Sequence, residues 1–234
     1  MCPSVQQPAT IHWLTQTSRD PQVSEQWLTA GEQATLARLH VAKRRSDWVL
    51  GRWTAKRALA AYLGDASRLG RIEIRAAESG APEVFLDGRA APLTLSLSHA
   101  AGRGLCAVTA AGVALGCDLE RIESRSRGFV ADYFTDDERR AIAAAPASDH
   151  ACVATLLWSA KESALKALRE GLRLDTRSVA ATVGGEPPVD GWCPLSVRHG
   201  DSGRIFRGWW RRDGSCVLTI VADPPPRLPI RLHQ

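Results

Sequence analysis

Apolar and polar positions alternate through the middle of the chain, and this alternation predicts β-strands there. In LTLSLSH (93–99), leucines alternate with threonine and serine, so one face of the strand is apolar. The run EVFLDG (83–88) precedes it and ends in a turn signal, whereas LCAVTA (105–110) follows a glycine-containing turn as its hairpin partner. The run GVALGCDLERI (112–122) then predicts a further strand.

Apolar residues at helical spacing predict helices on both sides of these strands. The first covers roughly 25–41, and the second, 46–64, ends at a glycine. The third, 135–145, opens with Thr-Asp-Asp-Glu, whose threonine and glutamate match a capping box. The fourth covers roughly 155–172.

Strand patterns return after the fourth helix, so the order of helices followed by strands occurs twice. The change falls near residue 112, which predicts two α+β halves, 1–112 and 113–234. Their sequence similarity is too faint to prove an internal pseudo-repeat. The proline-rich tail from about residue 223 is expected to be extended or disordered. The late strands are LSVRH (195–199), RIFRGWW (204–210) and CVLTIVA (216–222).

The composition is that of a soluble globular protein, with 44% hydrophobic and 24% charged residues among 234. No apolar stretch approaches the ~20 residues of a membrane helix, and the N-terminus lacks the features of a secretory signal. The six cysteines are scattered without metal-binding spacing, which favours reduced thiols and a cytoplasmic location.

The net charge of +5 favours an anionic partner. Basic residues gather at 43–57 and 207–214, close to several of the eight tryptophans, so nucleic-acid binding has to be considered. Most tryptophans in a chain with only four phenylalanines and two tyrosines are nevertheless expected to pack in the core or at interfaces.

Two carboxylates stand two positions apart in GCDLE, at Asp118 and Glu120. In a strand they would project from the same face, about 6.6 Å apart along the chain. Adjacent carboxylates repel unless a cation neutralises them, and Mg²⁺ suits such a pair because it takes few carboxylates and leaves positions for phosphate oxygens. The alternative is that the strand ends at Asp118, with Glu120 solvated beside Arg121.

A third carboxylate, Glu162, also has two interpretations. Ser159 and Glu162 match a capping box, so Glu162 could simply bond the backbone at a helix start. Glu162, Lys166 and Arg169 share one side of the predicted helix, which could be a solvated face or the wall of a phosphate site.

The combination of motifs resembles a known family. GCDLE (116–120) and WSAKESALK (158–166) match the paired signatures G-x-D-x-E and W-[ST]-x-K-E-[AS]-x-x-K of 4′-phosphopantetheinyl transferases of the surfactin-synthetase-activating type. LSLSHA and VLGRWTAKRAL resemble two further segments of that family, and the resemblance spans roughly 40–175. It implies a pseudo-dimer of two similar α+β halves with the active site in the cleft between them.

The resemblance also implies a reaction. These enzymes transfer the phosphopantetheine arm of coenzyme A to a serine of a carrier protein and release 3′,5′-ADP. By analogy, Asp118, Glu120 and Glu162 hold Mg²⁺, with Mn²⁺ as an alternative. Glu162 is the candidate general base, directly or through a metal-bound water. Lys166 is expected to stabilise charge on the phosphate, and Lys161 to position groups near the site.

Further residues are assigned to coenzyme A by the same resemblance. Ser98 and His99 match the pair that contacts a coenzyme A phosphate, and Lys161 and Lys166 are expected on the cofactor as well. Ala81 stands where the family often has a lysine. The expected basic partners from the first half are Arg45, Arg52 and Lys56, with Arg44 an equal candidate for the place of Arg45.

The expected partner is an apo acyl or peptidyl carrier protein of fatty-acid, polyketide or nonribosomal-peptide biosynthesis, and the sequence does not say which. We expect a monomer with no membrane or nucleic-acid partner. A Mg²⁺-dependent nuclease or phosphohydrolase and a non-enzymatic nucleic-acid-binding module are the alternatives, because both would use the same charged residues.

Overall fold

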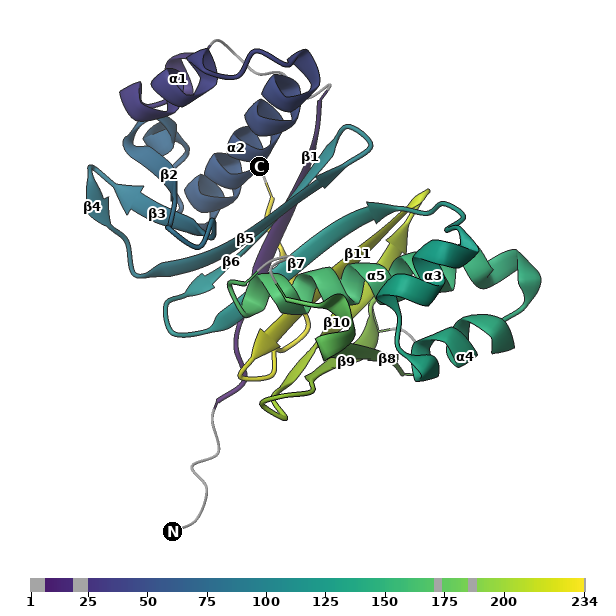
Figure 1. Ribbon diagram of the computed structural model, residues 1–234. Coiled ribbons are helices and arrows are strands. Elements are labelled where there is room, and N and C mark those ends of the chain that lie inside the picture. The colour runs from purple at the N-terminus through teal and green to yellow at the C-terminus, as the bar shows by residue number, and fades with distance from the viewer. Residues whose placement is uncertain (1–6, 19–24, 171–173, 185–188, 234) are drawn as a thin grey trace.

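Two long helices, each packed against a β-sheet, organise the molecule. The computed structural model describes residues 7–18, 25–170, 174–184 and 189–233. Helix α2 (Ala42–Tyr62) lies on the first sheet and α5 (His150–Ala167) on the second (Figure 1). The predicted α+β fold class is therefore confirmed.

The first sheet has the strand order β12-β1-β6-β5. Its central pair, β1 and β6, is antiparallel, and β5 and β6 form the predicted hairpin. A smaller sheet of β2, β3 and β4 lies beside it, with β3 in contact with β5. The strands are β1 (His12–Thr17), β2 (Ile72–Ala76), β3 (Pro82–Leu86), β4 (Arg89–Ala90), β5 (Leu93–Ala100), β6 (Arg103–Ala110) and β12 (Ile230–Arg231).

The second sheet is antiparallel throughout, in the order β7-β11-β10-β9-β8. It contains all the strands predicted after residue 112, together with one that the sequence did not suggest, β8. The strands are β7 (Ala114–Arg121), β8 (Val179–Val183), β9 (Cys193–His199), β10 (Ile205–Asp213) and β11 (Cys216–Asp223).

Shorter helices connect these layers. The capping box predicted at Thr135 and Glu138 is present at the start of α4, and Thr29 and Glu32 form a second one at α1. The helices are α1 (Ala30–Ala37), α3 (Arg127–Tyr133) and α4 (Asp136–Ala144). The 3-10 turns are η1 (Glu25–Trp27), η2 (Ala66–Arg71), η3 (Ala147–Asp149) and η5 (Thr176–Ser178).

Three local predictions differ from the structure. The helix expected over 25–41 is broken into η1 and α1, and α2 starts only after a break at residues 38–41. Helix α5 begins five residues before the predicted start. It ends at Ala167, short of the predicted end near 172, and Arg169 just after it has a left-handed backbone conformation with φ 61°. Strand β1 was not predicted. Its adjacent residues Trp13 and Leu14 are both buried, in two different core clusters, so the strand lacks the apolar–polar alternation of a half-exposed strand.

The two halves repeat one pairing pattern. In the first half, β6 lies between β1 and its hairpin partner β5. In the second half, β11 lies in the same way between β7 and its hairpin partner β10. The repeated order supports the pseudo-repeat, and the division at residue 112 stays a prediction.

The proline-rich tail is extended and crosses to the first half. Its strand β12 pairs in parallel with β1, and the Ala9 backbone amide donates to the Pro225 carbonyl at 3.0 Å. Of the two predicted states, extended or disordered, the structure has the first.

The structure also bears on the predictions from composition. Cysteines 106, 117, 152, 193 and 216 carry free thiols, and Cys2 lies outside the described residues. Within the described ranges, no helix combines the length and apolar character needed to cross a membrane.

Candidate active site

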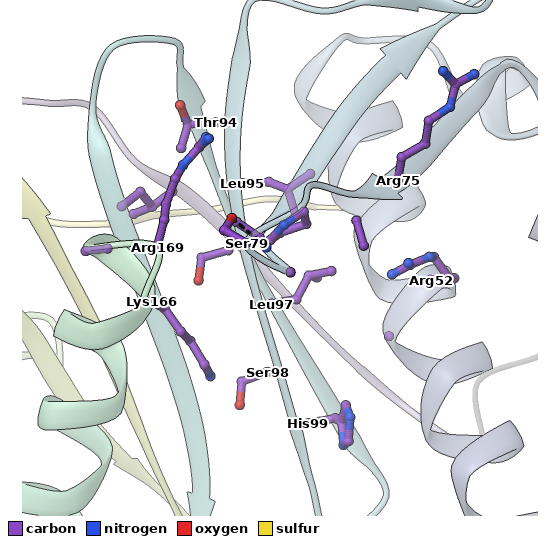
Figure 2. A pocket seen from close by; sticks show the side chains of 18 of the residues that line it. Arg52, Arg75, Ser79, Thr94, Leu95, Leu97, Ser98, His99, Lys166 and Arg169 are labelled. Carbon is purple, nitrogen blue, oxygen red and sulfur yellow. Dashed lines mark hydrogen bonds between the residues drawn. The ribbon is translucent and has the colours of Figure 1, made fainter. Parts of the chain in front are cut away.

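A pocket of about 540 Å³ is lined by both long helices and by strands of both large sheets. Helix α2, strand β5 and the turn between β2 and β3 line one part of it, and β7 and α5 line another. Figure 2 shows Lys166 and Arg169 at one wall, from α5 and the residues just after it, with Arg52 on α2 opposite. Arg75 and His99 also line the pocket, so basic side chains dominate its charged lining.

Asp118 joins this pocket to the carboxylate motif. It lies in β7 with 3% of its surface exposed. Its Oδ1 accepts hydrogen bonds from Ser98 Oγ and from Lys166 Nζ, each at 2.7 Å. Because Ser98 and Lys166 both line the pocket, Asp118 lies directly behind its wall. The other oxygen, Oδ2, is buried and has no hydrogen-bond partner.

Glu162 lies in the middle of α5, and its Oε1 is also buried without a partner. Burial, followed by the charge of Asp118, raises the pKa of Glu162 to about 7, with Lys166 opposing and Glu120 adding to the shift. Burial and then Asp118 also raise the pKa of Glu120, against the effect of Arg125, which donates to Glu120 Oε2 at 3.1 Å. Asp118 is therefore close enough to both glutamates to contribute to their raised pKa values.

The donor set suits a hard divalent cation. Two buried carboxylate oxygens, Asp118 Oδ2 and Glu162 Oε1, lack any partner, and such oxygens are costly to bury unless a cation or donor meets them. As they stand, no three His, Cys, Asp or Glu side chains among the described residues converge as a ready metal site. The Mg²⁺ assignment of Asp118, Glu120 and Glu162 thus stays a prediction.

Both plain alternatives for the carboxylates are wrong. Strand β7 continues to Arg121, so Asp118 does not end it. Since α5 starts at His150, Ser159 and Glu162 cannot form a capping box at its beginning. Ser159 Oγ instead hydrogen-bonds Thr219 Oγ1 at 2.9 Å, inside the core between α5 and β11.

On the cofactor side, Arg52, Ser98 and His99 line the pocket as predicted for cofactor contacts. The Arg52 guanidinium lies 4.9 Å from the centre of the Trp48 ring, and its buried Nε has no partner. Burial lowers the Arg52 pKa, with Glu32 opposing. A buried donor facing a pocket without an acceptor favours an anionic ligand.

Lys56 does not contact the pocket, so its assignment to coenzyme A is wrong. Its side chain is fully buried, and its ammonium lies 2.5 Å from Glu32 Oε2. It also donates to the carbonyls of Trp27 at 2.7 Å and Leu69 at 3.1 Å. Lys56 follows Arg52 by one turn of α2, so the sequence predicts that both lie on the same side of the helix. The spacing could not reveal that η1 and η2 cover α2 at Lys56.

Arg45 and Arg44 are also absent from the pocket lining. Arg45 Nη1 instead donates to the Leu36 carbonyl at 3.0 Å, at the end of α1. Their assignment to coenzyme A stays a prediction, and Arg52 is the basic residue of α2 that lines the pocket.

Lys161 points away from the pocket as well. It is fully buried, and its Nζ lies 2.5 Å from Glu138 Oε2 on α4. The Phe134 ring centre is 5.5 Å from the same ammonium. A direct contact between Lys161 and the cofactor does not fit this burial, whereas the expected role of Lys161 in positioning groups near the site stays a prediction.

Two basic lining residues, Arg75 and Arg169, were not assigned to the site from the sequence. Arg75 belongs to β2, a strand that was not predicted, and Arg169 was noticed only as a neighbour of Lys166 on the helix. Arg75 is paired with Glu73 at 2.6 Å. Ala81 lines the pocket too, at the place where the resemblance expects a lysine.

Without a divalent cation, Glu162 should make stability depend on pH. Its pKa is raised from 4.5 to about 7, so its contribution is fully present below pH 4.5 and is lost as the pH rises toward 7. In excess EDTA, Glu162→Gln should melt at the same temperature as wild type near pH 4.5 and a few degrees higher at pH 8, since ~1 kcal/mol moves Tm by roughly 2–4 °C. Melting curves across this range measure the difference, and a constant difference would contradict the raised pKa.

Comparisons with known proteins now add to this geometry. Residues 114–204 match the family model described as the 4′-phosphopantetheinyl transferase superfamily, a stretch that includes Asp118, Glu120 and Glu162. A crystal structure of a holo-(acyl-carrier-protein) synthase from Bacillus anthracis in complex with CoA (3′,5′-ADP) is 21% identical. It covers 44% of this chain and 95% of its own, with a TM-score of 0.37. No curated protein matches the sequence.

Proposed function

We propose that this protein transfers the 4′-phosphopantetheine arm of coenzyme A to a serine of an apo carrier protein, with Mg²⁺ or Mn²⁺ bound, as surfactin-synthetase-activating transferases do. One observation carries the proposal. Asp118 Oδ1 accepts from both Ser98 and Lys166, which joins the carboxylate motif to the basic pocket. The family model that matches residues 114–204 gives independent support.

The chemistry needs a base, a stabilised phosphate and a fixed geometry. The serine Oγ forms a bond to the β-phosphorus of coenzyme A, the bond from that phosphorus to the bridging oxygen breaks, and 3′,5′-ADP leaves. Glu162 accepts the serine proton, and its Oε1, which is buried without a hydrogen-bond partner, is free to do so. Lys166 offsets charge that builds on the phosphate oxygens.

A divalent cation would be held by Asp118, Glu120 and Glu162. When bound, it would supply Lewis-acid neutralisation of the diphosphate. The chain itself contributes the partnerless oxygens of Asp118 and Glu162, and it holds Lys166 beside them through the 2.7 Å pair with Asp118.

The pocket suits coenzyme A in size and charge. Its volume of about 540 Å³ falls in the usual range of ligand pockets. Arg52, Arg75, His99 and Arg169 present basic groups toward the phosphates. The net charge of +5 also complements carrier proteins, which are typically acidic around the modified serine.

His99→Ala should separate the 3′-phosphate from the rest of the cofactor. We expect the Kd for coenzyme A to rise about five- to twentyfold, because a hydrogen bond to a charged group contributes roughly 1.5–3 kcal/mol and solvent weakens it at the exposed His99. The Kd for 3′-dephospho-coenzyme A, which lacks the partner group, should change by less than about twofold. Calorimetry on both ligands measures this, and equal losses would remove His99 from the phosphate subsite.

The central experiment is incubation of the protein with coenzyme A, Mg²⁺ and apo carrier proteins of the fatty-acid, polyketide and nonribosomal-peptide types. Intact mass should show one phosphopantetheine adduct on at least one carrier. A folded protein that modifies none of them, or that cleaves nucleic acid or phosphoesters under the same conditions, would contradict the proposal.

A further inference from the structure

Both long helices carry nearly the same four-residue sequence, with threonine in one and serine in the other. Residues 53–56 on α2 are Trp-Thr-Ala-Lys, and residues 158–161 on α5 are Trp-Ser-Ala-Lys. Both lysines are fully buried. A buried lysine is rare unless it is paired, so two at matching positions point to a shared task.

Each lysine forms the same buried ion pair. Lys56 Nζ and Glu32 Oε2 are 2.5 Å apart, as are Lys161 Nζ and Glu138 Oε2. Within the two pairs, no side chain is more than 3% exposed. The cost of removing such charges from water is high, so geometry and further hydrogen bonds must compensate.

Those further bonds are also repeated. Each glutamate belongs to the capping box of the short helix before the long one, α1 or α4. Its second oxygen, Oε1, accepts a backbone N–H from a strand: Glu32 from Ile74 at 3.1 Å and Glu138 from Ala181 at 2.8 Å. Each pair therefore fixes one long helix to a short helix and to a strand, β2 or β8.

The two pairs hold the two long helices, α2 and α5, that both line the pocket. Lys56 follows Arg52, a pocket residue of α2, by one turn. Lys161 directly precedes Glu162 and stands five residues before Lys166, both on α5. Neither lysine lines the pocket, so each can act there only by setting the position of its helix.

We propose that Lys56 and Lys161 are positioning residues with separate tasks: the Lys56–Glu32 pair sets α2 for binding the cofactor, and the Lys161–Glu138 pair sets α5 for the chemical step. This inference rests on the proposed function. Apolar side chains could fill the same volume, but an ion pair with directional hydrogen bonds fixes helix rotation more closely. The same device thus controls ligand affinity on one wall and turnover on the other.

Two matched double variants test the division of tasks. Glu32→Gln with Lys56→Met and Glu138→Gln with Lys161→Met each remove both charges, so no unpaired charge stays buried. Calorimetry gives the Kd for coenzyme A, and transfer to a carrier at saturating coenzyme A gives kcat per folded molecule.

We expect Glu32→Gln with Lys56→Met to raise the Kd for coenzyme A about tenfold or more and to leave kcat within about threefold. We expect Glu138→Gln with Lys161→Met to lower kcat about tenfold or more and to leave the Kd within about threefold, because displacements near 1 Å can cost ~10²-fold. If either variant does not fold, the Kd and kcat are compared instead between Lys56→Arg and Lys161→Arg. These substitutions keep the positive charge but change its geometry.

Two results would overturn the inference alone: both variants changing Kd and kcat in the same proportion, or both changing only the fraction of folded protein. A wild-type protein that neither binds coenzyme A nor modifies a carrier would instead contradict the proposed function, and the inference with it.

Discussion

Glu162→Gln is expected to lower the rate of phosphopantetheine transfer by about 10²–10⁴-fold, the usual contribution of a general base. Glutamine has the shape of glutamate but can neither accept the serine proton nor balance a cation with its charge. Folding should survive, because Glu162 Oε1 has no hydrogen-bond partner to lose. Intact-mass transfer rates and melting curves on the same preparation measure both quantities.

Ser159→Ala is the matched control on the same helix. It removes the hydrogen bond between Ser159 Oγ and Thr219 Oγ1 in the core, at a cost of about 0.5–1.5 kcal/mol of stability. Its transfer rate should stay within a few-fold of wild type. Near-normal activity of Glu162→Gln would mean that this carboxylate is neither the base nor a ligand of a catalytic cation.

Lys166→Met should have the second large effect. The ammonium lies 2.7 Å from Asp118 Oδ1 and 3.1 Å from the Cys117 carbonyl at the pocket wall. We expect kcat to fall by about 10²–10³-fold, as when a single preorganised charge-stabilising donor is removed. The free energy of unfolding should fall as well, by up to about 3–5 kcal/mol, because the Asp118 carboxylate would stay buried without the Lys166 ammonium.

Lys166→Arg separates these two effects. It keeps the positive charge, so it should recover most of the stability, but the planar guanidinium cannot reproduce the ammonium geometry and kcat should stay low. Single-turnover rates and urea unfolding measure the two properties. A Lys166→Met variant with an unchanged kcat would exclude a role for this ammonium in the chemical step.

The sequence predicted which motifs meet but not which of their residues reach the pocket. Asp118 and Lys166 are 48 positions apart and were assigned to one site by resemblance, and the structure pairs them. Lys161 belongs to the same motif and points into the core instead. Helical spacing predicts the direction in which a side chain leaves its helix. What surrounds that side chain depends on which other elements pack there, and α4 covers Lys161.

The internal repeat is another case in which the sequence carried a signal that was hard to read. Overall similarity between the halves is faint, but Trp-Thr-Ala-Lys at 53–56 and Trp-Ser-Ala-Lys at 158–161 match closely. The capping glutamates Glu32 and Glu138 lie 24 and 23 residues before the lysines that they pair with. Only the structure shows that these distant positions make one contact twice.

The pairing of β12 with β1 has a mechanical consequence. The chain passes from the first sheet to the second at residues 111–113, between β6 and β7, and returns to the first sheet through β12, so the two sheets are tethered at two places. Bodies tethered twice resist swinging open about a single hinge, and a core cluster that includes Trp13, Leu105 and Leu218 stiffens the junction further. A stiff junction keeps the pocket walls in place before a ligand arrives. Less ordering entropy is then lost on binding, which is the thermodynamic advantage of preorganisation.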